Sequence, residues 1–430
     1  MRPSLKLLVS ACAVAVCAAA PPLAAVAAAP APTATLAGSV LPSVAHSTLL
    51  GHTSATASVR VEFVLRPSHA GLLAKMAAHS SGRTGLSQKV INRLFRPAPA
   101  VRALVAAYMH ARGFRPAGAG VLTQSFTGTA AQAERAFGVS LQNYRLADGT
   151  TYRAPAGAIH VPAALAPRVI TVDGLNTLPL EHPAGLHHVT PKLKPNLAPL
   201  SGCTGSDNEQ TTNPGSLQPA DLADPSAYNS QPLLTAGDVG TGEAVGLVEF
   251  SGYANGDQLT FQSCYGISVP VSKVNVGLGN TSTGGGDEVA LDQEVVASQA
   301  PGLNHIWTYV APGSGTMAGM LDKILATSTA NGIHIISDSW GICEAGELKS
   351  SEAATNAVLQ LIAVKGISFF AASGDSGSSD CFRLGFNGFQ VDDPAAQQYA
   401  TGIGGTHLVP ANSAPNKERV WDDKTVGNKS

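Results

Sequence analysis

The sequence predicts an α/β protein in which a small α+β domain is followed by a larger domain built on a parallel β-sheet. Residues 50–176 mix strand and helix patterns, whereas short apolar runs alternate with helical stretches from residue 243 onward. Such alternation favours parallel strands joined by crossover helices. A chain of 430 residues also exceeds one ordinary core, so two domains with connecting segments are expected.

The first block contains strand-like and helix-like segments in turn. Strand patterns are found at 58–65 and 120–126, and helical spacing at 87–95 and 98–112. One more helix is expected at 129–138, with Thr129 as its N-cap and Gly138 as its stop. Together these elements predict a small α+β sandwich.

The second block contains four apolar runs of strand length, at 243–250, 305–310, 332–337 and 366–372. Helical stretches lie between them, at 288–299, 316–329 and 351–364. The first run is apolar enough for a strand that is buried on both faces, as parallel strands are.

The segments before and after the first block differ from it in composition. Arg2 and Lys6 precede an apolar run that ends in small residues, so 1–29 is predicted to be a signal peptide and the mature protein extracellular. A single-pass anchor is the alternative, which the Pro pair at 21–22 disfavours. Residues 177–226 are rich in Pro, His, Asn and Ser and predict an exposed linker that proteases can reach.

Composition limits the partners. The net charge is −2 and the sequence has no Lys/Arg clusters, so neither nucleic-acid binding nor a stable membrane association is expected. The protein is also expected to be a monomer. Charged residues make up only 13%, which leaves few ion pairs to lose in acid.

Cysteine usage predicts disulfides. Two of the six cysteines leave with the signal, and Cys203, Cys264, Cys343 and Cys381 remain. In an oxidising compartment these form two disulfides, in any of three connectivities, of which pairing by nearness in sequence is one. No Cys-x-x-Cys or Cys/His cluster supports zinc instead.

Two acidic motifs could carry chemistry. Glu288 and Asp292 lie one turn apart on a helix that opens with three glycines, so they share a face, and repulsion raises the pH at which one loses its proton. The alternative is that they complement the helix dipole. Asp375 follows the strand that ends at Ala372, where parallel sheets form sites, although a polar loop is also common there.

Two histidine-dependent serine protease patterns fit badly. Ser376 lies in a Gly-Asp-Ser-Gly sequence, as in chymotrypsin-like proteases, but that fold is all-β and needs a histidine base. A subtilisin-type triad needs an aspartate where Glu249 stands, and His305 and His334 lie inside predicted strands.

Together these motifs resemble the sedolisins, serine-carboxyl peptidases preceded by a kumamolisin-type pro-domain. In the first block the resemblance rests on 126–130, 136–138, 152–154, 161–167 and 172–175. In the second it rests on Glu288-x-x-Leu291-Asp292, 337–341, 372–377 and 404–406. It implies a ferredoxin-like activation pro-domain at 36–176 and a subtilisin-like peptidase domain at 227–430.

The resemblance implies a role for each motif. Glu288 would be the general base for a serine, Asp292 its orienting partner, and Asp375 the protonated oxyanion-hole donor. Ser339, Trp340 and Gly341 would line the substrate cleft. A carboxylate base suits acidic conditions, in which histidine is already protonated.

The family's Gly-Thr-Ser nucleophile and later calcium loop have no counterpart here, since no Gly-Thr pair is followed by Ser. We therefore expect a C-terminally incomplete domain that is inactive alone, with its serine beyond the end of the chain. No cofactor or metal is expected in this chain, whereas the full-length fold would hold calcium.

These inferences predict a secreted acid endopeptidase zymogen that acts on polypeptides and is inhibited by its own pro-domain. The alternative is a truncated or inactive secreted relative that acts as a pro-domain or binding protein. A retaining glycosidase is disfavoured, because two acids on adjacent turns of one helix cannot flank a sugar from opposite sides.

Overall fold

The computed structural model describes residues 32–80, 85–179, 219–223, 228–277, 279, 282, 284–407 and 419–420. The described residues from Thr33 onward belong to one compact unit. The predicted signal peptide lies outside the described residues, as does most of the predicted linker, so the domain boundaries stay predictions. Along the described part of the chain, no helix is both long and apolar enough to cross a bilayer.

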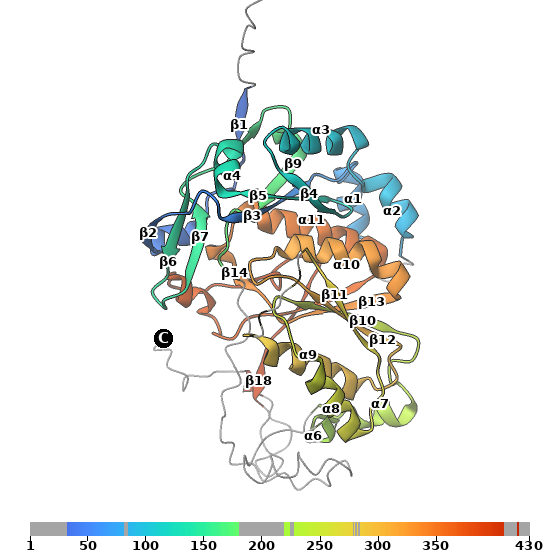
Figure 1. Ribbon diagram of the computed structural model, residues 1–430. Coiled ribbons are helices and arrows are strands. Elements are labelled where there is room, and N and C mark those ends of the chain that lie inside the picture. The colour runs from blue at the N-terminus through green and yellow to red at the C-terminus, as the bar shows by residue number, and fades with distance from the viewer. Residues whose placement is uncertain are drawn as a thin grey trace, which may run out of the picture. The chain divides into compact units, whose positions relative to one another are not determined.

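A four-stranded antiparallel sheet forms the centre of the first block (Figure 1). Its strands in spatial order are β4 (Arg115–Ala119), β5 (Thr123–Thr129), β3 (Ser58–Leu65) and β9 (Val169–Asp173). Helices α3 (Pro99–His110) and α4 (Ala130–Phe137) share a core with Val59, Val61 and Phe63 of β3. The β-α-β-β-α-β succession confirms the predicted α+β, ferredoxin-like class.

Helix α4 begins and ends where the sequence predicts. The Thr129 side chain accepts a hydrogen bond from the Gln132 backbone N–H, and the Gln132 side chain accepts one from the Thr129 N–H at 2.8 Å. This capping box satisfies two N–H groups that have no partner within the helix. Gly138 ends the helix in the left-handed conformation, with φ of 60°, where a side chain would be strained.

The strand predicted at 120–126 begins only at Thr123. The preceding residues turn toward Asp322 of the second block, whose carboxylate accepts hydrogen bonds from the backbone N–H groups of Val121, Leu122 and Thr123. A Cβ at position 120 would lie 2.0 Å from Asp322 Oδ2, so glycine is required there. Local periodicity carries no sign of such a distant partner, which is why the boundary was wrong.

The sequence does not predict several short elements of the first block. They are β1 (Thr33–Thr35), β2 (Thr48–His52), α1 (Ala70–Ala77), β6 (Leu141–Arg145), β7 (Thr151–Pro155) and β8 (His160–Pro162). β2, β6 and β7 form a three-stranded sheet, and β1 pairs with β8. The helix predicted at 87–95 is α2 (Gln88–Phe95), capped by Ser87.

Six parallel strands form the second sheet, which confirms the predicted parallel architecture. In spatial order they are β11 (Val271–Asn275), β12 (His305–Val310), β10 (Ala244–Glu249), β13 (Ile333–Asp338), β15 (Ser368–Ala372) and β17 (Thr401–Ile403). The four inner strands are those that the apolar runs predict. The sequence misses β11 and β17, because these short edge strands contain no buried residue and so no continuous apolar run.

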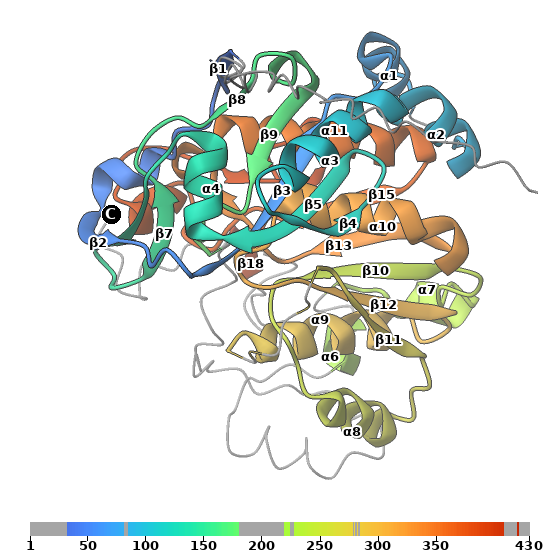
Figure 2. The ribbon, with the colours of Figure 1, turned by 45° about the horizontal axis from the view of Figure 1, so that its top comes forward.

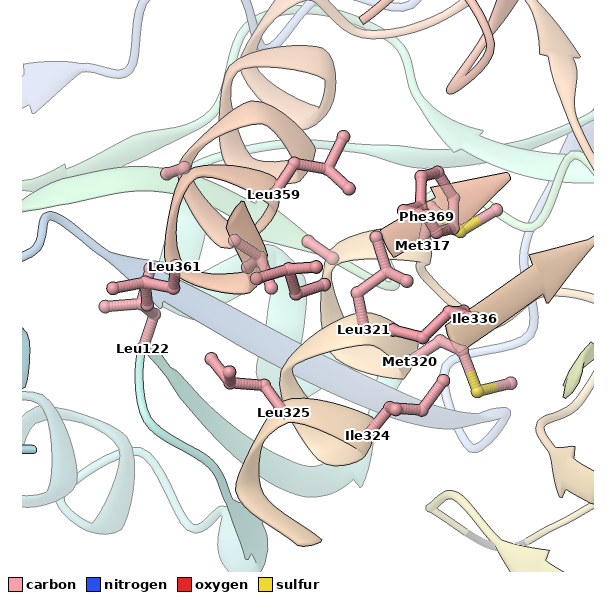
Figure 3. Packing of buried hydrophobic residues seen from close by; sticks show 14 of the residues in the cluster. Leu122, Met317, Met320, Leu321, Ile324, Leu325, Ile336, Leu359, Leu361 and Phe369 are labelled. Atoms are coloured by element: carbon pink, nitrogen blue, oxygen red, sulfur yellow. The ribbon is translucent and has the colours of Figure 1, made fainter. Parts of the chain in front are cut away.

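Helices α10 (Met317–Asn331) and α11 (Lys349–Lys365) lie between the two sheets (Figure 2). They share one apolar core with side chains of the first block, among them Leu122, which Figure 3 shows together with Leu321 and Leu361. Helices α8 (Asn255–Tyr265) and α9 (Gly286–Gln299) pack together, and α9 also contacts β10 and β12. The other short α-helices and strands of this block are α6 (Pro219–Ala223), α7 (Gln231–Ala236), β14 (Ile342–Cys343), β16 (Asp392–Asp393), β18 (Thr406–His407) and β19 (Arg419–Val420). Short 3-10 helices lie at Pro42–His46, Ala166–Arg168, Glu344–Gly346 and Asp380–Leu384.

Buried and half-buried carboxyl groups join the first block to α10 and α11. The Thr316 hydroxyl at the start of α10 donates to Glu62 Oε1 at 2.6 Å. The Ser351 hydroxyl in the first turn of α11 donates to Asp173 Oδ1, also at 2.6 Å. In the opposite direction, Asp322 in α10 accepts hydrogen bonds from the first block, including one from the Thr123 hydroxyl at 2.7 Å. The contact therefore combines an apolar core with directional hydrogen bonds.

Candidate active site

The candidate site lies at the carboxyl edge of the parallel sheet. β10 ends at Glu249, β13 ends at Asp338 just before Ser339, and β15 ends three residues before Asp375. Helix α9 begins nearby and carries Glu288 and Asp292 one turn apart, as the sequence predicts. Carboxyl ends of parallel strands meet at one edge, so residues far apart in sequence come together there.

Hydrogen bonds hold two of these carboxyl groups. The Ser339 hydroxyl lies 2.9 Å from each carboxylate oxygen of Asp292 and donates to that group. Asp292 and Glu249 lie close enough for the charge of Asp292 to act on Glu249. Glu249 in turn accepts a hydrogen bond from the Trp340 indole N–H at 2.9 Å. Ser339 therefore holds Asp292 and Trp340 holds Glu249, while Glu288 lies one turn from Asp292 on α9.

Burial and mutual repulsion raise the pKa values of the acids. Burial, together with the charges of Asp292 and Asp375, raises the pKa of Glu288 to about 8, against a hydrogen bond from Ser339. Burial also raises the pKa of Asp292 to about 6, although hydrogen bonds with Ser339 and Glu249 act to lower it. Glu249 is fully buried, and burial with the charge of Asp292 holds its pKa well above the ordinary value. These acids therefore cannot all be ionised together, and a protonated Glu249 can donate to Asp292.

The structure brings four of the predicted site residues together: Glu288 and Asp292 on α9, Ser339, whose hydroxyl donates to Asp292, and Asp375, whose charge acts on Glu288. Trp340 is only 3% exposed and packs against Phe250, with 6.0 Å between ring centroids. Its indole ring is therefore buried, and its N–H donates to Glu249. Gly341 lies against the side chain of Asp392.

Sequence reasoning missed Glu249 and Asp338 as members of this cluster. Asp338 is 2% exposed, accepts from the Trp340 backbone N–H at 3.0 Å, and has a pKa raised well above its usual value by burial. The sequence did contain a sign of both residues, because each is an acid at or just beyond the end of a predicted apolar strand. Burying a carboxyl group there costs free energy unless the group has a partner. His305 and His334 lie at the opposite, amino ends of β12 and β13, so neither serves this site.

A disulfide ties the loop that carries Asp375 to the segment after Ser339. It joins Cys343 and Cys381, with 5.1 Å between their Cα atoms, as pairing by nearness in sequence predicts. Cys264 is also disulfide-bonded. The expected partner of Cys264 is Cys203, which lies outside the described residues. In the described ranges, no group of three or more His, Cys, Asp or Glu side chains is arranged to hold a metal ion.

The raised pKa values predict that the free energy of unfolding falls as the pH rises. In the unfolded chain these carboxyls titrate near pH 4, whereas the folded pKa values are about 6 for Asp292 and about 8 for Glu288. The stabilisation is therefore complete below about pH 4 and is lost as the pH rises through about 6 and then about 8. Urea unfolding across this range measures the slope.

Glu288→Gln should flatten the upper part of this pH dependence, because it removes the carboxyl that titrates last. Asp287→Asn is the matched control, since Asp287 is exposed on the same turn of α9. An equal slope in Glu288→Gln and wild type between about pH 6 and 8 contradicts the assignment.

Comparisons with known proteins address both blocks. Residues 45–178 match the model of the pro-kumamolisin activation domain. The chain is 34% identical to kumamolisin of Bacillus sp. (strain MN-32) over 315 residues, which cover 71% of this chain and 53% of kumamolisin. Xanthomonalisin of Xanthomonas sp. (strain T-22) is 25% identical over 329 residues, which cover 70% of this chain and 38% of xanthomonalisin. The chain thus spans about half the length of the curated relatives it matches, or less.

Among solved structures, the Pseudomonas sedolisin, a serine-carboxyl proteinase complexed with two molecules of pseudo-iodotyrostatin, matches at 25% sequence identity. The match covers 44% of this chain and 55% of that chain, with a TM-score of 0.38.

Proposed function

The chain belongs to the sedolisin family and carries a pro-kumamolisin activation domain, and we propose that it is the precursor of a secreted serine-carboxyl endopeptidase. The protein would hydrolyse peptide bonds in polypeptides at acidic pH, with its own first block as intramolecular inhibitor. The observation that supports this best is the cluster of Glu288, Asp292 and Glu249, in which the Ser339 hydroxyl donates to Asp292 at 2.9 Å and the charges of the carboxyl groups act on one another. Its nucleophilic serine would come from sequence beyond Ser430.

In this proposal, Glu288 is the general base and Asp292 orients it. Glu288 removes the proton of the serine hydroxyl as the serine oxygen attacks the peptide carbonyl carbon, and returns that proton to the leaving amine. Asp292 holds the geometry as the third member of a triad does. The buried Glu249, when protonated, would donate a hydrogen bond to Asp292, and the Trp340 indole N–H donates to Glu249.

Asp375 would supply the oxyanion-hole hydrogen bond. A carboxyl group can donate only when it is protonated, so this role requires acidic pH. Protonation of Asp375 also removes one of the charges that raise the pKa of Glu288. Protonation of Asp375 would therefore both create the oxyanion-hole donor and favour ionisation of Glu288.

A base with a pKa of about 8 carries a proton at acidic pH, so the arrangement described above corresponds to a resting zymogen. Its conversion requires changes that lower this pKa. Burial is the largest cause of the shift, so entry of water into the site lowers the pKa. A hydrogen bond donated by the nucleophile acts in the same direction, as the one from Ser339 already does.

The test is to read the gene past codon 430 and to express the whole reading frame. An in-frame Gly-Thr-Ser segment, peptide hydrolysis at about pH 3 to 5, and labelling of that serine by a fluorophosphonate probe are expected. A stop codon directly after position 430, or a processed protein without hydrolysis, favours the alternative of an inactive secreted relative.

A further inference from the structure

The start of helix α9 is held from outside the helix by Ser251, which lies just beyond the end of β10. Ser251 is 4% exposed, and its hydroxyl oxygen accepts a hydrogen bond from the Gly285 backbone N–H at 3.0 Å. The same hydroxyl lies 3.2 Å from the carbonyl oxygen of Ser282, to which it can donate. The Gly252 N–H donates to that carbonyl at 2.7 Å. The segment after β10 therefore fixes the loop from which α9 begins.

Gly285 is the N-cap residue of α9 and packs against the site. A Cβ at this position would lie 2.9 Å from the Trp340 ring and 3.2 Å from Ser251 Cβ, so a side chain does not fit there. The indole of Trp340 is also the group that donates to Glu249. The first turn of α9 is therefore in contact with the same residues that hold the acids.

Glu288 is the third residue of α9 after this N-cap. A glutamate or glutamine at that position commonly turns back and accepts a hydrogen bond from the N-cap N–H, which completes a capping box. Helix α4 shows this arrangement, since the Gln132 side chain accepts from the Thr129 N–H. In α9 the corresponding N–H, that of Gly285, donates to Ser251 instead.

We propose that Ser251 is a positioning residue of the reaction, whose hydroxyl accepts the N-cap N–H of α9 and so keeps Glu288 from capping its own helix. The carboxyl of Glu288 is then available to the nucleophile. This inference rests on the proposed function for its catalytic meaning, whereas the contact at the N-cap rests on the geometry above.

The titration of Glu288 reports this competition. The charged groups that face its carboxyl are three other acids: Asp292 on α9, Glu249 of β10 and Asp375 after β15. Ser251→Ala leaves all three in place but frees the Gly285 N–H to donate to an ionised Glu288. A hydrogen bond to the charged form lowers a carboxyl pKa, so the pKa of Glu288 should fall from about 8.

Entry of water into the site would lower the same pKa, so a second measurement is needed. In a folded Ser251→Ala, the amide chemical shift of Gly285 should follow the ionisation of Glu288, because the two groups are then hydrogen-bonded. In the wild type this amide should shift little over the same titration, because it donates to Ser251. The wild-type measurement does not depend on the folding of any variant.

The experiment compares Ser251→Ala with Ser251→Thr, which keeps the hydroxyl. NMR titration of the 430-residue chain should show the lower pKa of Glu288 in Ser251→Ala and its recovery in Ser251→Thr. In the protein that contains the nucleophile, kcat should fall by about 10- to 100-fold in Ser251→Ala with KM nearly unchanged, and recover in Ser251→Thr. Ser298→Ala is the control, because that exposed hydroxyl of α9 donates to the carbonyl of Val295.

The outcomes separate the N-cap contact from the proposed function. A wild-type Gly285 amide that follows the ionisation of Glu288, or an unchanged Glu288 titration in a folded Ser251→Ala, overturns the inference. A lowered Glu288 pKa with unchanged kcat overturns the positioning role in an enzyme that is nevertheless active. A lowered pKa in Ser251→Ala, found for a wild-type protein that hydrolyses nothing, overturns the proposed function while the N-cap contact stands.

Discussion

Replacing Glu288 by Gln is expected to lower kcat by about 10²- to 10⁴-fold in the protein that contains its nucleophilic serine. The amide keeps the size of the side chain but cannot take a proton from the serine hydroxyl. KM should change little, because the loss occurs in the transition state rather than in substrate binding. Single-turnover kinetics with a peptide ester and a peptide amide at the optimal pH measure this.

Two further variants sharpen this test. Asp287→Asn removes an exposed carboxyl from the same turn of α9 and should leave kcat unchanged. Glu249→Gln keeps a group that can donate to Asp292 and should cost far less than Glu288→Gln. If Glu288→Gln retains wild-type kcat, another residue is the base and the role proposed for the α9 pair is wrong.

The inner part of the fold follows from local sequence patterns, whereas its edges do not. The strand at 58–65 and the inner parallel strands are visible because continuous or alternating burial leaves a continuous or alternating apolar pattern. The capped helix α4 is visible because its first and last turns need particular side chains. Edge strands such as β11 and β17 face solvent and leave no such pattern.

The candidate site divides in the same way. Glu288 and Asp292 could be predicted as a pair because their spacing on one helix is a local property. Glu249 could not be assigned to them, because its contact with Asp292 depends on how β10 and α9 pack. Likewise, the inward direction of the Ser339 hydroxyl becomes apparent only when β13 and α9 are seen together.

Removal of the Asp322 carboxylate is expected to produce the largest loss of stability in this chain. Asp322 is fully buried and accepts from three consecutive backbone N–H groups, those of Val121, Leu122 and Thr123, and from the Thr123 hydroxyl. Asp322→Ala leaves these donors without an acceptor, and each buried unsatisfied donor costs about 1 to 3 kcal/mol. We expect the free energy of unfolding to fall by about 3 kcal/mol or more.

Urea unfolding of Asp322→Ala measures this loss, and hydrogen exchange at residues 121–123 locates it. The exchange should accelerate at these amides before it does in β3, because the turn loses its partner while the antiparallel sheet keeps its ladder. Asp322→Asn retains one acceptor oxygen and should lose less, and Asp238→Ala, at an exposed position, should lose little. A similar unfolding midpoint for Asp322→Ala and Asp238→Ala would show that the carboxylate does not hold the activation domain on α10. If instead only the amides of the turn respond while global stability is kept, then the apolar core shared by Leu122, Leu321 and Leu361 is sufficient to hold the two blocks together.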